Sequence, residues 1–100
     1  LNSLMEDVDL LISPCMTSAP LTVVEMNGTA ANADQRAEFI TFTAPFDYSG
    51  HPTITLPAGL NAQGLPLSYQ LIGRHLEEGR LVRAGFAHER AFGMMPHPEV

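Results

Sequence analysis

The chain has 100 residues, of which 45% are hydrophobic and 16% are charged, and its formal net charge at pH 7 is −6. This length accommodates one small domain or a piece of one, and the aliphatic content excludes a disordered tail. No apolar run approaches the roughly 18 residues of a membrane span. Five Arg and no Lys give no basic surface for nucleic acid. We therefore expect residues 1–100 to form a single segment without a membrane or nucleic-acid partner.

The lone Cys15 cannot form an internal disulfide, so a cytoplasmic location is expected. We expect this thiol to be buried and inert, because no partner histidine is indicated by the sequence. The chain begins at Leu1 with no signal-peptide pattern, which we interpret as a fragment whose natural start lies upstream.

The first half of the chain predicts a strand, a loop and a helix. Residues 8–13 form a short apolar run closed by a proline, which is typical of a buried strand. Residues 14–29 show no sustained period, which favours a long surface loop. Residues 30–42 carry alanines and Ile40 at helical spacing, and Pro45 either interrupts this helix or starts a second turn.

The second half predicts a β-hairpin and a helix. Residues 53–58 and 67–72 alternate polar and apolar side chains on either side of a turn that contains Gly59 and Gly64. The first of these strands is expected beside the strand at 8–13. A helix over 77–92 then carries one apolar stripe and is ended by Gly93 and Pro96; the stripe comprises Leu81, Val82, Gly85, Phe86 and Phe92.

The order strand, helix, hairpin, helix predicts the α/β class. Three strands and two helices cannot cover both faces of a sheet. We therefore interpret the chain as a fragment of a layered α/β/α mixed sheet that is incomplete on its own.

Few residues carry recognisable chemistry. The histidines at 51, 75, 88 and 97 are never three or four apart, so they predict no helical metal pair, and we expect neither a metal nor a cofactor. His51 is expected to make local hydrogen bonds in a turn, and His88 to be packed or half-exposed. No serine lies in a GxSxG elbow, so no catalytic residue is assigned.

Several sequence blocks occur in an order that resembles the C-terminal end of the amidase signature family. The blocks are DLLISP at 9–14, FTAPFDYSGHP at 42–52, LPAG at 56–59 and GLPLSYQLIGR at 64–74. The resemblance implies a large α/β/α enzyme that hydrolyses linear amides with a serine nucleophile, a second serine in a cis peptide and a lysine base. Those residues belong to upstream motifs, and this chain contains no Lys.

The same resemblance implies a substrate-binding role for Phe39, Thr43 and Phe46, which surround the Thr-x-Pro motif. The alternative is that both phenylalanines belong to the core. The implied partners are a small-molecule amide and the remainder of the amidase chain, or a second copy of the segment. A competing interpretation is a free-standing, non-catalytic α/β binding or assembly module. In either case, the segment alone is expected to be inactive.

Overall fold

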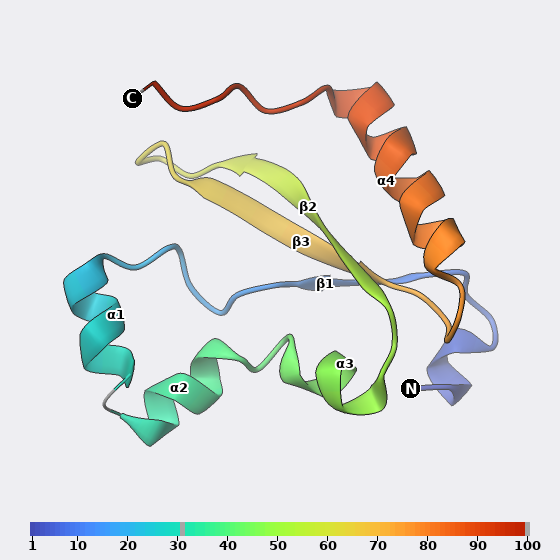
Figure 1. The fold of residues 1–100 in the computed structure, drawn as a ribbon, viewed down its shortest axis with the longest axis horizontal. Coiled ribbons are helices and arrows are strands. Elements are labelled where there is room, and N and C mark those ends of the chain that lie inside the picture. Colours follow the sequence, from blue (N-terminus) through green and yellow to red (C-terminus); the bar gives the residue numbers. More distant parts are fainter. Residues whose placement is uncertain (31, 100) are drawn as a thin grey trace.

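A computed structural model describes residues 1–30 and 32–99. The described elements are a short 3-10 helix, three strands and four α-helices, which confirms the expected α/β class (Figure 1). In chain order they are η1 (Ser3–Met5), β1 (Leu11–Pro14), α1 (Val23–Ala30), α2 (Ala33–Phe39), α3 (Ala44–Ser49), β2 (Thr53–Leu60), β3 (Pro66–Ile72) and α4 (Glu78–Phe92).

The three strands form one antiparallel sheet in the order β1-β3-β2. The predicted hairpin is confirmed, and its two glycines adopt positive φ angles of 108° at Gly59, in a bulge of β2, and 79° at Gly64, in the turn. The expectation that β2 lies beside β1 was wrong. β3 lies between them and pairs antiparallel with both, with Gln70 opposite Ser13 of β1 on one side and opposite Thr55 of β2 on the other.

Helix α4 packs against β2 on one face of the sheet (Figure 1). Its bounds confirm the predicted helix, which ends at Gly93. The close approach occurs at Gly85, where an added Cβ would lie 2.9 Å from Cδ1 of Ile54. The predicted apolar stripe was too wide. Only Leu81 and Gly85 are buried, whereas Phe86 is 61% exposed and Val82 and Phe92 are exposed as well.

The segment between β1 and β2 differs most from expectation. Residues 14–29 were predicted to be a loop, but α1 begins at Val23. Thr22 and Glu25 form a reciprocal cap, in which the backbone N–H of Thr22 donates to Glu25 Oε2 at 2.7 Å and the N–H of Glu25 donates to Thr22 Oγ1 at 3.2 Å.

The helix predicted over 30–42 is shorter than expected. It extends over Ala33–Phe39 only, because Asn32 caps it and accepts hydrogen bonds from the backbone of Asp34 and Gln35. Pro45 lies in the first turn of a separate helix, α3, which begins at Ala44, in accordance with one of the two expectations for this proline.

The chain is a small, incomplete domain. It exposes 7358 Å², whereas a compact monomer of this mass exposes about 5,500 Å². Its radius of gyration is 15.5 Å, against roughly 13 Å for a compact chain of this length. Ile12, in the middle of β1, is 70% exposed. Within residues 1–30 and 32–99, no helix has both the length and the apolar character needed to cross a bilayer.

Candidate functional site

The segment that contains the predicted site residues is tied to the centre of the sheet by Gln70. This side chain is 3% exposed, and its Nε2 donates to the carbonyl oxygen of Phe42 at 2.7 Å and to that of Pro14 at 3.1 Å. A buried amide with both N–H groups bonded has a fixed orientation. The backbone immediately before Thr43 is therefore held against β1 and β3.

Thr43 and Phe46 lie one turn apart at the start of α3. The backbone N–H of Phe46 donates to the carbonyl oxygen of Thr43 at 3.1 Å, and the Thr43 hydroxyl donates to the carbonyl oxygen of Ile40 at 3.4 Å. Both side chains are half-buried. The structure thus brings these two predicted site residues together.

Phe39 lines a cavity of about 280 Å³, and neither Thr43 nor Phe46 is among the residues that line this cavity. The cavity is formed by the loop after β1, by Met26 of α1, by Phe39 at the end of α2 and by the start of β3 around Leu67. Phe39 itself is half-buried. The predicted site is therefore divided between one turn of α3 and a separate apolar cavity.

His51 joins the end of α3 to the N-terminal segment. It is 6% exposed, its Nδ1 lies 2.8 Å from Ser49 Oγ and its Nε2 lies 3.1 Å from Asn2 Oδ1. Its ring contacts that of His75, with the centroids 3.9 Å apart and the ring planes tilted by 37°. Burial, and then the charge of His75, lower the pKa of His51 below its usual value. The local bond to Ser49 was expected, whereas the bond to Asn2 has no signal in the sequence.

Ser49 and His51 form one hydrogen-bonded cluster with the backbone of α3. The Ser49 hydroxyl lies 3.3 Å from the carbonyl oxygen of Phe46 and 2.8 Å from Nδ1 of His51, at the end of α3. This cluster holds α3 in place, and we assign it no catalytic role.

Arg74 is a second anchor that was not expected from the sequence. Its guanidinium donates to the carbonyl oxygen of Met5 at 3.0 and 2.7 Å and to that of Val8 at 2.9 Å. Met5 is fully buried, so the Arg74 side chain fixes the N-terminal segment where it enters the sheet.

Two further residues were considered in the sequence, Cys15 and His88. Cys15 is buried, and His88 is half-buried, with its Nδ1 2.7 Å from the hydroxyl of Tyr69. Across the described ranges, no three His, Cys, Asp or Glu side chains converge as metal ligands.

Comparison with known proteins identifies the family. The family model described as Amidase matches residues 1–82. The chain is 42% identical over 93 residues to "Putative amidase AmiD" of Mycobacterium tuberculosis (strain ATCC 25618 / H37Rv), a match that covers 93% of this chain and 20% of that protein. It is 41% identical over 93 residues to a subunit of the glutamyl-tRNA(Gln) amidotransferase of Dinoroseobacter shibae, a match that covers 91% of this chain and 18% of that protein.

The chain thus spans about a fifth of the length of the curated relatives that it matches. The match includes the β-hairpin, the Thr-x-Pro turn before α3 and the sequence around His51 and Gln70. These are the elements that fix α3 to the sheet. This chain belongs to the amidase family.

Proposed function

We propose that residues 1–100 act as one segment, the C-terminal part of an amidase-type hydrolase that cleaves linear amide C–N bonds. The observation that carries this proposal is the family match over residues 1–82, and the matches to the two relatives, which cover about a fifth of each, support it. The large exposed area of the chain is the surface that an additional four-fifths of a protein would cover.

The chemistry in this proposal is performed outside the segment by a Ser-Ser-Lys triad. The serine oxygen attacks the amide carbonyl carbon, the C–N bond breaks, and the amine leaves with a proton delivered from the triad. Water then hydrolyses the acyl-enzyme to a carboxylic acid and restores the serine. Residues 1–100 contain no Lys, so in this proposal the segment has no catalytic residue and is inactive alone.

The proposed contributions of the segment are three sheet strands and part of the substrate pocket, at Phe39, Thr43 and Phe46. Half-burial of all three supports this role, because such side chains can be contacted from a neighbouring part of the protein. The Gln70 bond to Phe42 supports it as well, since a pocket wall requires a fixed backbone.

The proposed partners follow from the outer strands and the exposed face of the sheet. β1 and β2 are the outer strands of the described sheet, and Ile12 is exposed on its face. In the whole enzyme, the remainder of the chain would cover these features. In the isolated segment, we expect a second copy to do so, giving a dimer or a larger oligomer. Sedimentation that shows a stable, folded monomer at high concentration would contradict this expectation.

Substrate discrimination tests the pocket. The measurement is kcat/KM for one short and one aromatic amide, using Phe46→Ala and Thr43→Val in the natural polypeptide that contains this segment. A pocket wall predicts a change of about 1–3 kcal/mol in the discrimination between the two amides, with an unchanged melting temperature. Tyr48→Ala is the matched control, because Tyr48 lies on α3 but is fully exposed.

Two results would contradict this assignment. Equal losses on both amides, together with a lowered melting temperature, would mean that Phe46 and Thr43 are core residues, since truncating a buried Phe costs about 3–5 kcal/mol. A native protein whose intact mass equals that of these 100 residues would favour the free-standing binding or assembly module instead.

A further inference from the structure

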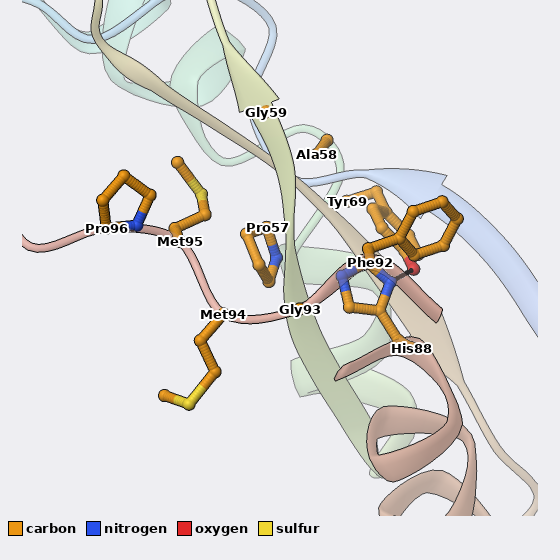
Figure 2. Close-up of a pocket in the computed structure, with 10 residues that line it drawn as sticks. All are labelled: Pro57, Ala58, Gly59, Tyr69, His88, Phe92, Gly93, Met94, Met95 and Pro96. Carbon is orange, nitrogen blue, oxygen red and sulfur yellow. Dashed lines mark hydrogen bonds between the residues drawn. The ribbon is translucent and has the colours of Figure 1, made fainter. Parts of the chain in front are cut away.

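An open cleft of about 580 Å³ lies between the hairpin, the last turn of α4 and the chain that follows it. Figure 2 shows the rings of Tyr69, His88 and Phe92 gathered on one side of this cleft and Pro57, Met95 and Pro96 on the other. The ring centroids of His88 and Phe92 are 5.0 Å apart, and those of Tyr69 and His88 are 5.6 Å apart. The lining of the cleft therefore includes three aromatic rings and two methionine side chains.

The cleft contains one polar pair. The Tyr69 hydroxyl lies 2.7 Å from Nδ1 of His88. A neutral imidazole that accepts this bond carries its own proton on Nε2. Within the described part of the chain, Nε2 of His88 has no hydrogen-bond partner. In the tautomer whose Nδ1 accepts from Tyr69, Nε2 offers one N–H donor among the aromatic rings.

The cleft is separate from the proposed amide pocket. Its lining does not include Phe39, Thr43 or Phe46, and His88, Phe92 and Met95 all follow the residues that match the family. It also lies on the α4 face of the sheet, whereas Gln70 holds the segment before Thr43 on the opposite face. A ligand in this cleft would therefore leave the Thr43 turn accessible.

We propose that this cleft is a binding site for a small, neutral aromatic molecule that carries one carbonyl group. Its volume lies within the range of ligand sites, about 300–1,000 Å³. Aromatic rings and methionine sulfur favour offset or edge contacts with a flat apolar ligand. The Nε2–H of His88 supplies the single donor that a carbonyl oxygen requires. Phe92 is 79% exposed in the segment, so its ring lies at the rim of the cleft.

The five methionines provide a built-in test. Met94 and Met95 line this cleft, Met16 and Met26 line the cavity around Phe39, and Met5 is buried in the core. The natural polypeptide that contains this segment is labelled with ¹³C-methyl methionine, titrated with acetophenone and followed by NMR. We expect a saturable shift of the Met95 methyl with a dissociation constant on the order of 1 mM. Met16, Met26 and Met5 should not move.

Three substitutions make the test specific. Phe92→Ala should weaken acetophenone binding about threefold to tenfold, as expected for the loss of one aromatic contact. Phe86→Ala is the matched control, since Phe86 is an exposed phenylalanine on the same helix outside the cleft, and it should bind normally. The unchanged Met5 methyl reports that each variant is folded.

The third substitution tests the donor. Acetophenone should bind about threefold to tenfold more tightly than anisole, whose ether oxygen is a weaker acceptor. His88→Phe should abolish this preference while the Met95 shift persists. Any of three results would overturn the proposal: no saturable shift of Met95, parallel shifts of Met16 and Met26, or equal effects of Phe92→Ala and Phe86→Ala.

Discussion

Replacing Gln70 by Met tests the role of this side chain in holding the segment before Thr43. Methionine has a similar volume and no N–H donor, so the substitution removes both hydrogen bonds of Nε2. The carbonyl oxygen of Pro14 keeps the hydroxyl of Ser13 as a donor at 2.9 Å, whereas that of Phe42 loses the bond from Gln70. A lost bond costs about 0.5–1.5 kcal/mol, and an orphaned buried acceptor costs about 1–3 kcal/mol.

We therefore expect Gln70→Met to lower the free energy of unfolding by about 2–3 kcal/mol. Gln70→Glu should lower it further, because a carboxylate oxygen would face two carbonyl oxygens without a proton to share. The assay is urea unfolding followed by far-UV circular dichroism at pH 7. Gln63→Met is the matched control, since Gln63 is exposed in the hairpin turn, and should change stability by less than about 0.5 kcal/mol. Equal stability of the Gln70 and Gln63 variants would refute the reasoning.

Two further substitutions and a pH series test the packing. Gly85→Ala should leave the free energy of unfolding within about 1 kcal/mol of wild type, because the gain in helix propensity offsets the displacement of the Ile54 methyl. Gly85→Val should lower the free energy of unfolding by about 1–3 kcal/mol. An unchanged urea midpoint for Gly85→Val would contradict the close approach of α4 to Ile54. The pKa of His51 is lowered on folding, so the unfolded chain binds more protons and the urea midpoint should fall as pH decreases below about 6.5. His51→Asn should flatten this dependence, and an unchanged pH profile in that variant would exclude His51 as its source.

Local signals predicted the hairpin and the last helix. Alternation on both sides of a turn identifies a β-hairpin, and α4 ends at Gly93, which adopts a positive φ of 72°. A local signal of the same kind precedes α1. Thr22 and Glu25 have the spacing of a capping box, and the structure shows both of its hydrogen bonds.

The strand order and the anchors could not be predicted in this way. Polar and apolar residues alternate in a similar way in β2 and β3, so this pattern alone does not determine which of the two strands pairs with β1. The bonds from His51 to Asn2 and from Arg74 to Met5 join residues 49 and 69 positions apart. Such pairs have no local sequence pattern, because they form only when the sheet brings distant segments together.

The candidate site was predictable to a similar extent. The Thr-x-Pro turn places Thr43 and Phe46 together, since proline favours the first turn of a helix. Phe39 instead lines a separate cavity together with Met26 of α1, a helix within the region that was expected to be a loop. That cavity could not be predicted because one of its walls comes from this unexpected helix.

The activity of the segment alone, compared with its activity within the whole natural polypeptide, tests the proposed function most directly. Both are purified twice and assayed for hydrolysis of a short aliphatic and an aromatic linear amide. We predict turnover by the whole polypeptide and none by residues 1–100, which contain no Lys to serve as the base. Turnover by the isolated segment that survives the second purification would contradict this prediction.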